Sequence, residues 1–469
     1  MIKIIKKNWI SQPNKQVLHL ALPLTGSRLL STITGFLCFA LLSRYNSNAL
    51  AASALISSTQ LVVLIAGMAI LLSTNILVGY SFGKKQFDKI ANITHQSIIL
   101  ALCISITLVL VFRCVKPILL YFHQPEHIVL IASTYFDAFS YGVPAILVFA
   151  AIQQTLFSIK KQNIAVMCDV FSLILTLFLA ISFIYGRFGF SEFGIVGLAY
   201  ALTAQAWFIT LLLLAYLAFH PTCKKYNFFK EIKFSSVCFF QLFNIGWPIS
   251  LCITGEISSL FAITVMAGWL GVESLNIQHI ATQYLLLLVV PIFGISQAIS
   301  VLSSHLIGAK QSEMLSSFGY SAIKLGFIFT SIALVVFTLF PKALISIFVN
   351  TQDTSNYELI KTTTSLLLIV CTGQFFDALR NICSGSLRSM GITIQPMLIT
   401  IAYIWIFSIP LAYYLGFKLG FGLVGVNIAY NIGMMLAGIN LFHLWSQKTI
   451  IFSSNNNRLI EDRTEQIFP

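Results

Sequence analysis

Long apolar stretches, each of the length of a membrane span, dominate this 469-residue chain. A helix that crosses the hydrocarbon layer needs about 20 apolar residues, since lipid cannot satisfy the polar groups of the backbone. The stretches cover residues 17–42, 52–81, 90–112, 128–158, 163–184, 194–219, 238–269, 277–305, 315–340, 358–387, 394–416 and 422–447. The sequence therefore predicts an all-α membrane protein with twelve transmembrane helices.

The composition excludes a soluble protein of this size. Only 9% of the residues are charged and 57% are hydrophobic, whereas soluble domains carry about 25% charged residues. The net charge of +13 would suit a nucleic-acid partner, but the basic residues fall in short loops between apolar stretches. The nine cysteines are scattered and form no metal-binding or disulfide pattern. We therefore expect no nucleic acid and no resident metal.

The basic residues also predict the orientation of the chain. Of the 28 Lys and Arg residues, 18 lie on the side that holds both termini and 7 on the other side. The remaining three, Arg28, Lys324 and Arg380, lie within spans. Because cytoplasmic loops are enriched in Lys and Arg, both termini are expected in the cytoplasm. Residues 1–16 are expected to form a cytoplasmic segment with no signal peptide, and residues 448–469 a disordered cytoplasmic tail.

The two halves of the chain repeat each other at a nearly constant offset. Pro23 and Pro248 are 225 residues apart, as are the segments that start at Gly83 and Gly308. The segment Gly194-Ile-Val-Gly197 recurs as Gly422-Leu-Val-Gly425, at an offset of 228. The repeats predict two six-helix lobes, 17–220 and 238–447, joined by a cytoplasmic linker at 221–237. Parallel repeats of this kind typically rock against each other around a central site.

Four carboxylates lie in or beside the apolar stretches: Asp137, Asp169, Glu256 and Asp377. A charge at the bilayer centre costs about 2.5–3.5 kcal/mol, so a buried acid indicates a function or a charged partner. Glu256 and Asp377 lie deepest, in the seventh and tenth spans. Their oxygens suit Na⁺, and two carboxylates that face one cavity can also share a proton. The sequence leaves Na⁺ and H⁺ both open.

Arginines within the spans offer a purely structural alternative. Arg380 follows Asp377 by three residues and shares its helix face, so it could neutralise Asp377 permanently. No basic residue lies within one helical turn of Glu256. In the first lobe, Arg28 and Asp169 are expected at similar depths and could form an ion pair. Alternatively, each could extend separately to the cytoplasmic interface.

Other polar residues within the spans are weaker candidates for lining a cavity. Asn427 and Asn431 are four residues apart and share one face of the twelfth span, where they could hydrogen-bond a neighbouring helix. The full set of cavity-lining candidates is Gln278, His279, Tyr284, Gln374, Arg380, Asn427 and Asn431.

Several motifs resemble the multidrug and toxin extrusion (MATE) transporters. The main ones are Gly246-Trp-Pro248 followed by Glu256, and Gln374-Phe-Phe-Asp377 followed by Gly385-Ser-Leu-Arg388. Further matches are Val143-Pro144, Tyr185-Gly186, Gly194-Ile-Val-Gly197 and Gly308. The resemblance extends from Pro23 to about Trp445.

The resemblance implies a two-lobed, twelve-helix exporter of a bacterial inner membrane that exchanges Na⁺ or H⁺ for organic, often cationic, compounds. It places Glu256 and Asp377 at the acidic positions that the family uses for cation coupling in the second lobe. The family commonly has an acidic residue in the first span, and this chain has Cys38 there. The accompanying Asn positions in the fifth span are Thr176 and Ala180. The resemblance therefore favours coupling through Glu256 and Asp377.

We therefore predict secondary active multidrug efflux by a monomer, with a small organic substrate and no cofactor besides the coupling ion. The alternative is a flippase or exporter of a lipid-linked or endogenous metabolite, which should have more arginines facing its cavity than Arg28 and Arg380. An enzyme is disfavoured because the chain contains no HExxH or P-loop motif. Substrate identity and stoichiometry are left open.

Overall fold

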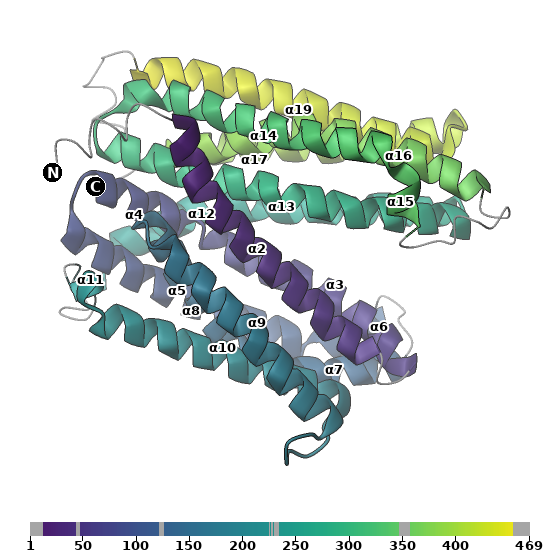
Figure 1. The fold of residues 1–469 in the computed structure, drawn as a ribbon, viewed down its shortest axis with the longest axis horizontal. Helices are drawn as coiled ribbons and strands as arrows, with labels where there is room; N and C mark the ends of the chain where they lie inside the picture. Colours follow the sequence, from purple (N-terminus) through teal and green to yellow (C-terminus); the bar gives the residue numbers. More distant parts are fainter. Residues whose placement is uncertain are drawn as a thin grey trace. The chain divides into compact units, whose positions relative to one another are not determined.

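The computed structural model describes residues 13–43, 47–121, 126–224, 226, 228, 234–346 and 357–453. Within these ranges the regular structure is helical, without a strand (Figure 1). The helices of the first half are α2 (Pro13–Ser43), α3 (Ser47–Ile70), α4 (Ser73–Gly83), α5 (Phe87–Arg113), α6 (Val115–Tyr121), α7 (Glu126–Ser140), α8 (Val143–Ser158), α9 (Gln162–Tyr185), α10 (Gly194–Phe219) and α11 (Pro221–Lys224). The predicted N-terminal segment and C-terminal tail lie almost wholly outside the described residues.

The second half begins with one of the longest helices and ends with another. Its helices are α12 (Ser236–Trp269), α13 (Val272–Gly308), η1 (Ser312–Met314), α14 (Leu315–Leu339), α15 (Pro341–Ile345), α16 (Tyr357–Ser389), α17 (Ile394–Ile401), η3 (Ala402–Ser408), α18 (Ile409–Tyr413), η4 (Tyr414–Lys418) and α19 (Gly422–Ser453). The segments η3 and η4 are π-helical and flank the short helix that contains Pro410.

The helices coincide with the predicted spans to within a few residues at most ends. Among the described residues, ten helices are long and apolar enough to cross a membrane, and an eleventh span is formed by α7 and α8 together. That pair bends by 54° at a break that contains Gly142, just before Pro144. The first predicted span corresponds to the 31-residue helix α2.

Two compact units divide the chain. One contains Gly26–Ser250, and the other contains Met1–Thr25 together with Leu251–Pro469. The divisions fall inside α2 and α12, two residues after Pro23 and two residues after Pro248. They therefore lie at corresponding positions of the repeat, not in the linker that the sequence suggested. The lobe boundaries at 17–220 and 238–447 stay a prediction.

The repeat is visible in the backbone. Lys85 follows α4 with φ 61°, and Lys310 follows α13 with φ 56°. In both turns the residue after the lysine hydrogen-bonds back to the last turn of the helix. The Gln86 N–H donates to Ser81 O at 3.0 Å, and the Gln311 N–H donates to Leu306 O at 2.8 Å. Because a left-handed lysine is an uncommon conformation, its recurrence 225 residues later supports a duplicated ancestral unit.

Close helix contacts position the site in the second unit. A Cβ added to Gly385 of α16 would lie 2.5 Å from Ser296 O of α13. Membrane helices approach this closely through small residues, since packing between them replaces the hydrophobic effect. Helix α16 packs along both α13 and α19. The polar face of α16 is therefore enclosed by protein.

Candidate functional site

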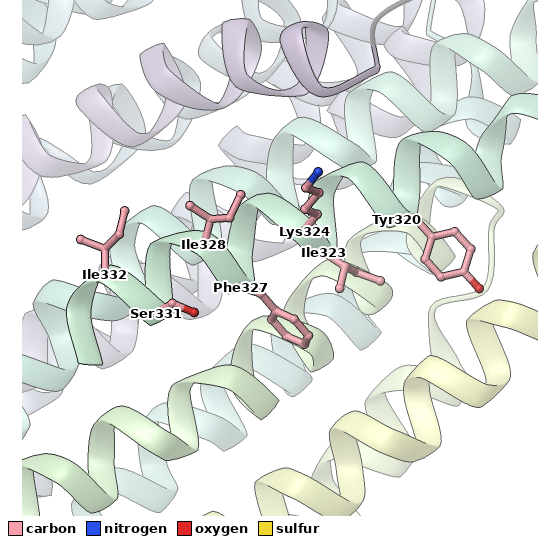
Figure 2. Close-up of a pocket in the computed structure, with 7 residues that line it drawn as sticks. All are labelled: Tyr320, Ile323, Lys324, Phe327, Ile328, Ser331 and Ile332. Atoms are coloured by element: carbon pink, nitrogen blue, oxygen red, sulfur yellow. The ribbon is translucent and has the colours of Figure 1, made fainter. Parts of the chain in front are cut away.

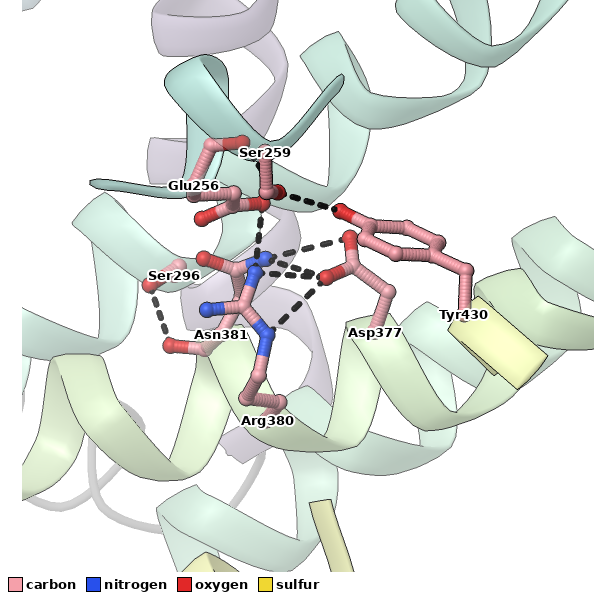
Figure 3. Close-up of polar contacts among 7 residues, drawn as sticks. All are labelled: Glu256, Ser259, Ser296, Asp377, Arg380, Asn381 and Tyr430. Atoms are coloured by element: carbon pink, nitrogen blue, oxygen red, sulfur yellow. Dashed lines mark hydrogen bonds and ion pairs between the residues drawn. The ribbon is translucent and has the colours of Figure 1, made fainter. Parts of the chain in front are cut away.

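Three helices of the second unit contribute the charged cluster. Glu256 lies on α12, Asp377 and Arg380 on α16, and Tyr430 on α19 (Figure 3). Asp377 and Arg380 are three residues apart, so the helix places both side chains on one face. The side chain of Glu256 approaches the same point from α12.

Arg380 binds both carboxylates. Its Nη2 donates to Glu256 Oε1 at 2.6 Å and to Asp377 Oδ1 at 2.6 Å, and its Nε donates to Asp377 Oδ1 at 3.1 Å. Asn381 Nδ2 lies 3.1 Å from each Asp377 oxygen. The side chains of Arg380 and Asp377 are 1% and 4% exposed, whereas that of Glu256 is 17% exposed. Glu256 is therefore the acid of the pair that is open to its surroundings.

Hydroxyl groups fix the helices around this ion cluster. Ser259 Oγ donates to the Glu256 carbonyl at 2.6 Å and lies 3.3 Å from the Tyr430 hydroxyl, which connects α12 to α19. Ser296 Oγ of α13 donates to the Asn381 carbonyl at 2.6 Å. These bonds hold the backbone on both sides of the carboxylates.

Arg388 adds a fourth charge. Its guanidinium is buried, at 8% exposure for the residue, and lies against the Cys252 thiol, one turn before Glu256 on α12. Arg388 follows the predicted tenth span by one residue and is one of the 18 basic residues on the side of the termini; in the structure it lies within α16. Two acids and two arginines sum to zero formal charge, so a cation that enters must compete with Arg380.

The structure shows which basic residues lie beside Asp377 and Glu256. The Asp377–Arg380 ion pair is present, as the structural alternative supposed. No basic residue lies within one helical turn of Glu256 along α12, but Arg380 of α16 reaches it from a position 124 residues away. Asn381 and Tyr430 are part of the cluster although the sequence did not indicate them, and the burial of Arg388 was not predicted either. Asn381 follows Asp377 by four residues, so helical spacing could have placed it on the same face of α16.

In the first unit, the structure brings Arg28 and Asp169 within electrostatic range of each other. Asp169 also accepts hydrogen bonds from the Ser27 hydroxyl and from Gln153 Nε2, which lies 3.3 Å and 3.2 Å from its two oxygens. Asp169 is buried, and Ser27 and Gln153 were not foreseen. Cys38, Thr176 and Ala180, at the family's usual first-lobe acidic and Asn positions, are all buried.

The cavity-lining candidates fall into different environments. Asn427 Nδ2 donates to Gln278 Oε1 at 2.8 Å, which links α19 to α13. Tyr284 is in an apolar cluster and donates to the Leu344 carbonyl at 2.8 Å. Asn431 donates to the Ile369 carbonyl, and His279 is exposed beside Gln283. Gln374 is buried, and its Oε1 has no partner among the described residues. A role of any of them in a cavity stays a prediction.

The chain belongs to the MatE family, whose model matches residues 23–182 and 248–414. The two matched stretches begin at Pro23 and Pro248, the first pair of residues in the repeat. Relatives that align with this chain do so over nearly its whole length. The probable multidrug resistance protein NorM of Synechococcus sp. is 24% identical over 429 residues, which are 90% of this chain and 92% of the relative. The multidrug resistance protein NorM of Burkholderia vietnamiensis is 23% identical over 91% of this chain and 92% of its own length.

Solved structures of MATE transporters share the fold. A MATE protein in its straight conformation superposes with a TM-score of 0.85 at 20% identity, over 95% of this chain and 98% of the other. An outward-facing multidrug resistance MATE transporter superposes with a TM-score of 0.84 at 20% identity, over 94% and 97%. The chain is therefore an integral membrane protein with the twelve-helix, two-lobed MATE architecture predicted from its sequence.

Proposed function

We propose that this protein exports organic cations in exchange for Na⁺ or H⁺, and that Glu256, Asp377 and Arg380 couple the two movements. One observation carries the proposal: carboxylates from two helices share a single guanidinium inside the membrane. Buried ionisable groups of this kind mark ion pathways in transporters. The multidrug resistance names of the relatives support the substrate class.

In this mechanism Arg380 is the counter-ion of both carboxylates until a cation arrives. A proton or Na⁺ that binds Glu256, the more exposed acid, removes one partner of Arg380 and leaves the guanidinium with Asp377 alone. The Glu256–Arg380 contact joins α12 to α16, so its loss weakens one connection between these helices. Cation binding would thereby favour a different arrangement of the helices, which is the requirement for alternating access.

Ethidium efflux from proteoliposomes under an imposed Na⁺ or pH gradient tests the proposal. The wild-type protein should move ethidium only when one of the two gradients is present. Glu256→Gln and Asp377→Asn should each abolish the dependence of ethidium movement on the gradient. A neutral side chain cannot release Arg380 and bind a cation in its place. Asp137→Asn is the matched control, because Asp137 is an exposed carboxylate on α7. Undiminished coupling in both cluster variants would refute the proposal.

A second function, export of an anionic or lipid-linked metabolite, is favoured by Arg388. Such an exporter is expected to have more arginines facing its cavity than Arg28 and Arg380, and Arg388 is a further buried arginine. The discriminating experiment offers proteoliposomes cationic ethidium and anionic carboxyfluorescein in parallel. Transport of the anion alone, lost in Arg388→Gln, would establish this second function in place of the first.

A further inference from the structure

Lys324 is an exposed charge within a membrane-spanning helix. It is the tenth residue of α14, and among the described residues it has no hydrogen-bond or ion-pair partner. At 1.5 Å per residue, a 25-residue helix centred on a hydrocarbon layer of about 30 Å places its Cα roughly 10 Å inside that layer. An ammonium group at such a depth needs a counter-charge or a route to the headgroups.

A shallow groove of about 520 Å³ runs along this part of α14, and Lys324 lies in it (Figure 2). Figure 2 shows Lys324, Ile328 and Ile332 in one row on the helix, with the rings of Tyr320 and Phe327 on another side. The ring of Tyr320 packs edge-on against Trp445 of α19 at 5.1 Å, and that of Phe327 lies 5.7 Å from the ring of Phe375. These contacts fix the aromatic side of the groove.

The row that contains Lys324 changes character along the helix. Towards the start of α14 it continues as Ser321 and Ser317, whose exposed turn is closed by a hydrogen bond from Ser321 Oγ to the Ser317 carbonyl at 2.8 Å. Towards the end it continues as Ile328 and Ile332, which are 46% and 61% exposed. Along the helix, two hydroxyls and one positive charge are thus followed by exposed apolar side chains. A phospholipid has the same order, with a polar headgroup followed by an acyl chain.

We propose that this row binds an anionic phospholipid, with its phosphate at Lys324 and one acyl chain along Ile328 and Ile332. Charge complementarity selects an anionic lipid, since Lys324 is the cation of the row and Glu313 lies outside α14, in η1, 11 residues before Lys324. In the orientation predicted from the basic residues, this end of α14 is cytoplasmic, and the lipid belongs to the inner leaflet.

Native mass spectrometry of the purified full-length protein tests this proposal without requiring transport. The protein is mixed with phosphatidylglycerol and phosphatidylethanolamine of identical acyl chains, and the retained lipids are counted. The wild type should prefer phosphatidylglycerol by about fivefold, the contribution of one lysine near an anionic headgroup. Lys324→Gln should reduce the preference nearly to one. Lys324→Arg should preserve it, which also shows that the position tolerates substitution.

Lys342→Gln is the control, because Lys342 is another exposed lysine that lies outside the row, on α15. It should keep the wild-type preference. An equal preference in the wild type and in Lys324→Gln would overturn the proposal. Displacement of the lipid by inorganic phosphate would show a simple anion site, and a dimer lost on Lys324→Gln without lipid would show that a second copy covers the row. Either result would also overturn it.

Discussion

Arg380 sits between two acids that the sequence places on different helices. A buried ion pair gains little stability over an apolar replacement, but removal of one partner leaves an uncompensated charge that costs about 3–5 kcal/mol. Arg380 satisfies Glu256 and Asp377 at once, so its loss would leave two such charges. A cation bound from outside could then replace the guanidinium.

Arg380→Gln should therefore lower stability by about 3 kcal/mol or more and make stability depend on added cations. Thermal unfolding in detergent, measured with and without Na⁺ and at lower pH, checks this expectation. Na⁺ or acid should raise the unfolding midpoint of the variant more than that of the wild type. Arg187→Gln, at an exposed loop arginine, should show no such effect. A variant as stable as the wild type, and indifferent to cations, would contradict the counter-ion role.

Asp169 is the buried acid of the first unit that faces Arg28, and the effect expected from its substitution is on folding. Asp169→Asn removes the charge that faces Arg28 and weakens the bonds from Ser27 and Gln153. We expect a reduced yield of monodisperse protein, measured by size-exclusion chromatography, while Asp137→Asn keeps its yield. An unchanged yield and activity for Asp169→Asn would mean that the pairing matters little.

At the scale of helices, glycines set how closely α13 and α16 approach behind the ion cluster. Gly385→Ala would place a methyl group against the backbone oxygen of Ser296 and force the helices apart. Overpacking of this kind costs about 1–3 kcal/mol, so the unfolding midpoint should fall. Gly268→Ala is a matched control, because a Cβ at Gly268 of α12 meets nothing within 4 Å. Equal midpoints for the two variants would contradict the close packing.

The helices were predictable because a span needs only length and hydrophobicity, which are local properties of the sequence. Within one helix, the Asp377–Arg380 pair was also accessible, since helical spacing determines it. The Glu256–Arg380 contact was not, because it depends on how α12 packs on α16. The burial of Arg388 was not predictable for a similar reason: it depends on packing against Cys252 of α12, which the sequence does not give.

At the scale of the whole molecule, the duplication organises both units. Pro23 and Pro248, the paired left-handed lysines and the two family-model matches all repeat at an offset of 225. An even number of helices in each repeat gives both halves one orientation in the membrane. The basic residues then predict the side on which the termini lie.

Reporter fusions test this orientation. A fusion at the C-terminus and an insertion within 221–237 should both report the cytoplasm, where alkaline phosphatase is inactive and a fluorescent protein folds. An insertion within 350–356 should report the opposite side. Active phosphatase at the C-terminus would contradict the predicted topology, and with it the inner-leaflet position of the lipid site.

As substrate moves, a cation is proposed to replace Arg380 as the counter-ion of two membrane-embedded acids. The most direct measurement loads proteoliposomes with ethidium and records the Na⁺ or H⁺ flux that the ethidium gradient drives. The wild type should produce an opposing ion flux in proportion to ethidium movement, and the double variant Glu256→Gln/Asp377→Asn should produce none. An ion flux of wild-type size in the double variant would show that coupling does not pass through these residues.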